Sequence, residues 1–230
     1  MVAALVAVLL WPFHAGPAPE AARPLPLAGL VVVIDPGHGG IDSGAIASGV
    51  QEKGINLAVS LAAAQEIRGL GGRVVLTRTA DQARVPLGQQ RYLRDRRQRA
   101  AMVAESGAQL FVAIHANYVG SAAPSGPLVL WNASANPGGR ALAQAIRTAL
   151  ARELGTRVAL SRQSIAVLSW SGVPAALVEV GFLSNPGERA MLQNAAYQVR
   201  LGVAIATGVR AYWSARRAEE TFWRGLAWAP

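Results

Sequence analysis

The 230-residue chain contains no cysteine, which excludes disulfides, thiolate metal sites and cysteine nucleophiles. It also lacks an apolar run of about 18 residues, so the sequence predicts no membrane-spanning helix. Histidine is scarce, with 3 in the chain, and Lys53 is the single lysine among many arginines. Any bound metal must therefore be held by those few histidines and by the 13 acidic residues.

The composition is that of a folded, strongly basic protein. Hydrophobic residues make up 52% of the chain and charged residues 15%, which excludes a disordered polypeptide. A net charge of +9 favours anionic partners such as nucleic acid, lipid or acidic cell-wall polymers. Because arginine enrichment is also typical of a GC-rich genome, we do not expect specific nucleic-acid binding.

Both ends of the chain differ in composition from its middle. Met1–Trp11 is apolar and is followed by a proline- and alanine-rich stretch, so residues 1–28 are predicted to be an export signal and linker, although the usual basic start is missing. We therefore expect an exported protein, in the periplasm or in the cell wall and extracellular space. The catalytic domain is expected over residues 29–214, followed by a basic, aromatic tail over 215–230.

Hydrophobic patterns alternate between strand-like and helix-like segments along the middle of the chain. Strands are expected over residues 30–34, 73–77, 109–115, 127–131, 166–168 and 174–180. Helices are expected over 51–69, within the arginine-rich region before 106, over 138–154 and over 197–212. This alternation predicts a single α/β domain, a three-layer sandwich whose largely parallel sheet is flanked by helices.

Polar residues capable of chemistry fall at the predicted ends of three strands. His38 follows the first strand, His115 ends the third, and Glu179 lies near the end of the last. Glu52 begins the helix after the first strand. Because ligands bind beyond the carboxyl ends of strands in such sheets, these groups are expected to meet. Two imidazoles and a carboxylate can hold one Zn²⁺ with a position open for water, and a second carboxylate could take the proton of that water.

Each of these residues also has a plainer interpretation. His38 could serve turn geometry in its glycine-rich segment, Glu52 could complement the helix dipole, and His115 could be a hydrogen-bonded core residue. Glu179 is the hardest to explain in this way, because a buried unpaired carboxylate is unfavourable. The spacing matches no short zinc motif such as HExxH, and the glycines fit neither a dinucleotide-binding motif nor a phosphate-binding loop.

Five segments in fixed order carry a more specific signal. They are VVVIDPGHGGIDSGA, QEKGINLAVSLA, VVLTRTAD, LFVAIHAN and PAALVEVGFLSNPGERAML. From about Leu30 to Trp213 the chain resembles the zinc-dependent N-acetylmuramoyl-L-alanine amidases of the type-3 family. The resemblance implies an α/β sandwich with a mixed sheet. It also implies hydrolysis of the peptidoglycan amide between the lactyl group of N-acetylmuramic acid and L-alanine, in cell-wall remodelling or daughter-cell separation.

The resemblance also implies roles for individual residues. The implied ligands of the single zinc ion are His38, Glu52 and His115. Glu179 would be the catalytic carboxylate, which accepts a proton from water and passes it to the leaving amine. Asn117 and Trp170 are candidate substrate contacts.

The chain departs from the family pattern in the segment before His115. Val103-Ala104 stands where the family often has Asn-Ala, and Gln109 stands where it has an acid, whereas Arg99 matches a recurrent arginine. These departures are expected to affect stability or the approach of substrate rather than catalysis. The Arg91–Arg99 segment is interpreted as a solvated helix face that could also contact anionic wall polymer.

The short connection after His115 predicts an open site. Some division-linked members carry a long helical insertion there, which blocks the zinc until an activator binds. Only about 25 residues separate His115 from the next expected helix, so we expect neither a plug nor an obligatory activator. The alternatives to an amidase are a zinc peptidase that cuts a stem-peptide bond, a wall-binding module without activity, and a basic nucleic-acid binder.

Overall fold

The computed structural model describes residues 24–83, 91–132 and 137–227. One six-stranded sheet consists of β1 (Val31–Pro36), β4 (Arg73–Leu76), β5 (Leu110–Asn117), β6 (Leu128–Trp131), β7 (Ala159–Arg162) and β8 (Ala175–Phe182). A small antiparallel ladder consists of β2 (Ile46–Ala47) and β3 (Val50–Gln51). The helices are α1 (Glu52–Gly69), α2 (Arg91–Ser106), α3 (Gly139–Leu154), α4 (Ala166–Trp170), α5 (Pro186–Leu192) and α6 (Ala195–Ala227).

The strand order is β4-β1-β5-β8-β6-β7. All neighbours run parallel except β8 and β6, which are antiparallel, so the sheet is mixed. Consequently the carboxyl ends of β1, β5 and β8 lie side by side at one edge, as the sequence predicts for the strands that carry the polar residues.

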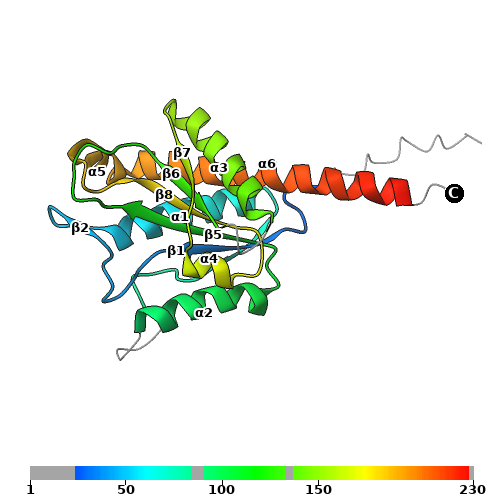
Figure 1. The fold of residues 1–230 in the computed structure, drawn as a ribbon, viewed down its shortest axis with the longest axis horizontal. Coiled ribbons are helices and arrows are strands. Elements are labelled where there is room, and N and C mark those ends of the chain that lie inside the picture. Colours follow the sequence, from blue (N-terminus) through cyan, green and yellow to red (C-terminus); the bar gives the residue numbers. More distant parts are fainter. Residues whose placement is uncertain (1–23, 84–90, 133–136, 228–230) are drawn as a thin grey trace, which may run out of the picture.

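Helices cover both faces of this sheet. Helices α1, α3 and α6 pack together on one face, and α2 and α4 cover the other (Figure 1). Each face has its own apolar cluster, and β1 contributes to both: Val32 and Ile34 point to the first and Val33 to the second. A strand buried on both faces is continuously apolar rather than alternating, which explains the Leu30–Ile34 run. The predicted three-layer α/β sandwich is confirmed.

One predicted strand is wrong. Residues 166–168 lie in the short helix α4, whereas the strand of this region is β7, over Ala159–Arg162. Three apolar residues are too few to distinguish the two periodicities. In addition, β7 is a sheet-edge strand with no fully buried residue, so its sequence carries little apolar signal.

The last helix is longer than its sequence pattern predicts. It continues 15 residues past Tyr212 to Ala227 and projects beyond the rest of the domain (Figure 1). Phe222, Trp223 and Leu226 near its end are all more than half exposed. The described part of the chain contains no helix that is both long enough and apolar enough to cross a membrane.

The residues just before β1 pack onto the body of the domain. Leu27 is fully buried, and its amide donates to the Leu70 carbonyl at 2.9 Å. The Ala28 carbonyl accepts a hydrogen bond of 3.3 Å from the Arg217 guanidinium on α6. The chain therefore enters the domain beside the point where α6 leaves it.

Candidate metal and catalytic site

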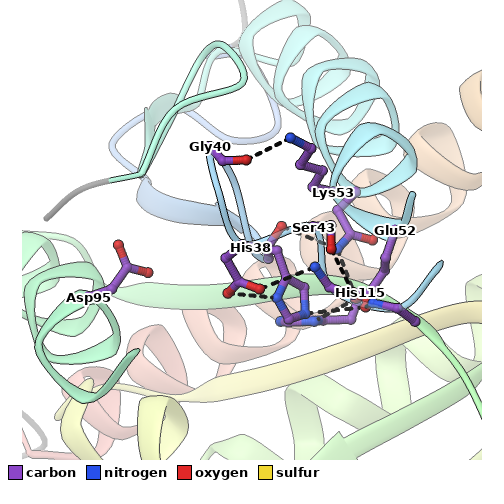
Figure 2. A network of polar contacts seen from close by, with 12 residues as sticks. His38, Gly40, Ser43, Glu52, Lys53, Asp95 and His115 are labelled. Atoms are coloured by element: carbon purple, nitrogen blue, oxygen red, sulfur yellow. Dashed lines mark hydrogen bonds and ion pairs between the residues drawn. The ribbon is translucent and has the colours of Figure 1, made fainter. Parts of the chain in front are cut away.

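Three of the predicted site residues converge at the carboxyl edge of the sheet (Figure 2). His38 comes from the loop after β1, Glu52 is the first residue of α1, and His115 lies in β5. Glu52 stands between the imidazoles: its Oε2 is 3.2 Å from His38 Nε2, and its Oε1 is 3.0 Å from His115 Nδ1. One donor atom from each side chain lies within 4.8 Å of the other two, so the group could hold a metal ion.

Glycines permit this close approach. A Cβ at Gly37 would stand 2.2 Å from Cε1 of His115, and a Cβ at Gly44 would stand 2.4 Å from Oε2 of Glu52. His38 itself adopts a left-handed backbone conformation with φ 62°, which is uncommon for a residue with a side chain. Such strain clusters at functional sites, where the surrounding structure compensates for it.

Two residues not singled out from the sequence orient this cluster. Asp42 Oδ2 lies 2.9 Å from Nδ1 of His38. Asn56 donates from its amide to Glu52 Oε1 at 3.0 Å and to the Gly37 carbonyl at 3.2 Å. The sequence did contain a signal for Asn56, since a polar residue four positions after Glu52 on an apolar helix face is in reach of it.

Two buried arginines hold the loop that carries His38. Arg99 donates to the carboxylate of Asp35 and to the carbonyls of Pro36 and His38, each at 2.7 Å. Arg78 donates to the Pro36 carbonyl at 3.0 Å and to the next carbonyl at 2.9 Å. The solvated-face interpretation of residues 91–99 is therefore wrong for Arg99, which is 3% exposed because it pairs with an acid of β1.

The charges of the cluster stabilise one another. Burial by itself would raise the pKa of Glu52, but hydrogen bonds from the two imidazoles hold that pKa well below its usual range. Burial would likewise lower the pKa of His38, yet the adjacent Asp42 and Glu52 carboxylates outweigh it and raise the pKa to about 9. Without a metal, Glu52 is thus an anion bordered by cationic or hydrogen-bonding rings.

Glu179 lies beside the cluster in a different environment. It is the register partner of His115 on the neighbouring parallel strand, so both side chains point to the same face of the sheet. Its Oε2 is sealed from solvent and has no hydrogen-bond partner among the described residues. Burial, together with the charge of Glu52, raises its pKa to about 7 although His115 and His38 oppose the shift.

A cavity of about 310 Å³ opens over these side chains. It is lined by His38, His115 and Glu179, by residues of α2, and by residues in and just before α4. Its size is at the lower end of the range for small-ligand sites. The arrangement therefore joins a possible metal position and an unpaired carboxylate within one space open to a substrate.

Several other residues from the sequence analysis lie away from this cavity. Asn117 ends β5, where its carbonyl accepts from Leu183, and Trp170 ends α4 with the Arg97 guanidinium 5.5 Å from its ring centre; neither lines the cavity. Gln109 lies just before β5 and accepts a 2.6 Å hydrogen bond from the Val31 amide at the start of β1. It therefore joins these two strands at their amino ends, away from the metal position.

The donor set fits zinc. Two imidazoles and one carboxylate are typical zinc ligands, and three protein ligands leave a position for water or substrate, as in catalytic zinc sites. The described residues between β5 and α3 contain no helix that could cover this position.

Comparisons with known proteins show which family this chain resembles. The family model described as N-acetylmuramoyl-L-alanine amidase matches residues 32–211. The germination-specific N-acetylmuramoyl-L-alanine amidase of Bacillus subtilis is 34% identical over 196 residues, 83% of this chain and 82% of the relative. The match ends near the point where α6 leaves the domain.

Solved structures show the same likeness. The CwlD amidase of Clostridioides difficile, in complex with the GerS lipoprotein, aligns with a TM-score of 0.73 and 30% identity, covering 81% of this chain and 99% of that one. The catalytic domain of CwlV from Bacillus (Paenibacillus) polymyxa var. colistinus aligns with a TM-score of 0.70 and 34% identity, covering 80% and 98%. These matches confirm the resemblance drawn from the five segments: the chain belongs to the N-acetylmuramoyl-L-alanine amidase family.

Proposed function

We propose that this enzyme uses one zinc ion, held by His38, Glu52 and His115, to hydrolyse the amide between N-acetylmuramic acid and L-alanine in peptidoglycan. The observation that carries the proposal is the unpartnered Glu179 carboxylate in the cavity beside a His-Glu-His cluster. An unpaired buried acid is unfavourable for stability and is therefore typical of a residue kept for function.

The chemistry follows from the two kinds of group. Zinc in this position would act as a Lewis acid on the scissile carbonyl and on water. Glu179 takes the proton of the attacking water as the C–O bond forms, and returns it to the alanine nitrogen as the C–N bond breaks. A pKa near 7 suits both steps, because the group gains and loses a proton with similar ease at neutral pH.

The other residues keep the metal-binding atoms in place. Asn56 fixes the orientation of the Glu52 carboxylate, and Asp42 fixes the ring of His38 through the nitrogen not facing Glu52. Residues that support ligands in this way are worth about 10- to 100-fold in metal affinity or activity. Arg99 and Arg78 donate hydrogen bonds to carbonyls of the loop that carries His38. The loop is therefore ordered before metal binds.

We also propose that the enzyme acts outside the cytoplasm, on the cell wall, in remodelling or daughter-cell separation. In this proposal residues 1–28 are leader and linker, of which Leu27 packs onto the domain, and residues 29–214 are the catalytic domain. Residues 215–230 are a basic, aromatic tail that is helical as far as Ala227. The apolar start of the chain and its net charge of +9, suited to anionic wall polymers, support this assignment.

Digestion of purified peptidoglycan, with products identified by mass spectrometry, tests the activity. The zinc-loaded enzyme should release stem peptides that have a free L-alanine amino terminus, and a chelator should stop the release until zinc is restored. Muramoyl-peptides with shortened stems would instead identify a zinc peptidase. Binding to the wall without any cleavage would leave only a binding module.

The same assay tests whether the enzyme is active alone. The C. difficile CwlD structure contains a lipoprotein, so at least one relative forms a protein complex. For this chain we propose that no activator is required, because the described residues between β5 and α3 contain no helix. Purified zinc-loaded protein should then turn over without a lag, and strong latency relieved by a partner protein would contradict this.

A further inference from the structure

The charged side chains that line the cavity are almost all neutralised by a neighbour. Asp35 and Asp95 both pair with Arg99, and Asp42 lies 2.9 Å from His38. These contacts explain why the three aspartates are there: they help to build the scaffold around the metal position. Two charged groups of the lining have no such neighbour within the described ranges: the proposed catalytic carboxylate and a cation on α2.

That cation is Arg96. It lines the same cavity and is exposed. It makes no hydrogen bond, ion pair or ring contact with any part of the chain that the structure describes. Arg96 also does not tune the catalytic acid, because burial, Glu52 and the two histidines account for the shifted pKa of Glu179. An arginine without a partner inside a substrate cavity is free to bind an anion bidentately.

The same cavity also contains a carboxamide, from the segment before α4. Gln163, just before α4, lines the same cavity, and its side chain makes no contact of this kind with the described residues. The two segments are also connected by the Arg97 guanidinium of α2, which lies 5.5 Å from the centre of the Trp170 ring at the end of α4. A planar guanidinium and a carboxamide that line one cavity are a donor set for a carboxylate.

We propose that Arg96, with Gln163, binds a carboxylate of the stem peptide and makes the enzyme selective for stems in which that group is free rather than amidated. This inference rests on the proposed function for the identity of the substrate. The lactyl carboxyl of muramic acid is consumed in the scissile amide, so the repeating sugars offer no carboxylate there. The anion must come from the peptide.

The stem peptide presents such a group close to the scissile bond. Its first free carboxylate, or the carboxamide that replaces it, is on the residue that follows alanine. Two residues reach at most about 7 Å from the scissile nitrogen. A carboxylate would accept two hydrogen bonds from Arg96, whereas a carboxamide has one acceptor and adds a donor that repels the guanidinium.

Binding of the released peptides tests the site without requiring turnover. Calorimetry on the zinc-loaded enzyme compares a stem tripeptide with a free carboxylate on its second residue to the same peptide amidated there. We expect the acidic peptide to bind about 10- to 100-fold more tightly, the range for a charge-assisted pair, and Arg96→Ala to remove that preference. Arg94→Ala is the matched control, because Arg94 is exposed on the same helix and does not line the cavity.

Turnover of soluble muramoyl-peptides with the same two stems gives the second measurement. Arg96→Ala should lower kcat/KM about 10- to 100-fold for the acidic stem and leave the amidated stem nearly unchanged, with Arg96→Lys intermediate. Equal losses on both stems, or equal binding of both peptides by the unmodified enzyme, would overturn the inference. Selective binding without hydrolysis would uphold the Arg96 site and refute the amidase activity.

Discussion

Glu52 and Glu179 lie at the same edge of one sheet but in opposite surroundings. The Glu52 carboxylate is surrounded by hydrogen-bonding partners: two imidazoles, the Asn56 amide and the backbone amide of Ala45. Glu179 is sealed from solvent at Oε2 and has no partner there. The first environment stabilises the anion and lowers the pKa, and the second destabilises it and raises the pKa to about 7.

This difference separates two tasks that need the same functional group. A metal ligand must be deprotonated at all working pH values, whereas a proton carrier must change state near neutral pH. Carboxylates whose surroundings push their pKa values apart commonly divide such work. The comparison therefore predicts that equivalent substitutions at the two positions have different consequences.

The largest effect is expected for Glu52→Gln. The neutral amide keeps the shape of the side chain but removes the only anionic donor of the cluster, so zinc retention and activity should both be lost. The loss of zinc affinity should exceed the roughly 10- to 100-fold attributed to residues that merely support a ligand. Metal analysis after dialysis and a zinc titration of activity measure both quantities. A variant that retained one equivalent of zinc would remove Glu52 from the ligand set.

Glu179→Gln should affect turnover while zinc stays bound. Loss of a general acid–base group lowers the rate by about 10²–10⁴, and the contacts that join His38, Glu52 and His115 do not involve this side chain. Parallel measurements of kcat and bound zinc on the two glutamine variants separate ligand from proton carrier. Full activity in this variant would show that another group moves the proton.

The metal-free protein offers a stability test of the same contrast. Because the pKa of Glu179 is raised from 4.5 to about 7, the folded state binds more protons than the unfolded state between those values, and stability falls as pH rises through that window. The penalty is complete above about pH 7 and amounts to at most about 3 kcal/mol.

Glu179→Gln should therefore be more stable than the parent protein at pH 8 when a chelator is present, with the advantage fading towards pH 4. Urea unfolding at several pH values measures it. Glu105→Gln, at an exposed position of α2, is the control and should show no comparable change. An equal pH dependence in parent and Glu179→Gln protein would mean that Glu179 is not destabilised by its burial.

Much of this site could be predicted from the sequence because its residues end strongly apolar strands. His38, His115 and Glu179 each follow or interrupt such a run, and parallel strands necessarily bring their carboxyl ends together. Arg78 could not be found in this way. Its role depends on contacts with carbonyls about 40 residues earlier in the chain, which no local pattern encodes.

The helices and strands also differ in how well the sequence predicts them. Buried strands and long helices were predicted close to their observed positions, whereas β7 and α4 were misassigned. Both are short and lie where one side of the chain meets solvent, so apolar periodicity is weak there. The far end of α6 was not predicted, because residues after Trp213 have no apolar face that packs on the domain.

The smallest effect is expected for Asn56→Ala, which changes the surroundings of Glu52 and leaves the carboxylate in place. Removing the amide deletes hydrogen bonds of 3.0 Å to Glu52 and 3.2 Å to the Gly37 carbonyl, so the ligand loses part of its orientation. Zinc affinity should fall about 10- to 100-fold, with kcat at saturating zinc largely retained. Ser60→Ala is the matched control, because Ser60 is buried one turn further along α1 and its hydroxyl has no partner among the described residues. If both variants bound zinc as the parent does, Asn56 would not be needed to orient Glu52, and the contrast with Glu179 would need no help from α1.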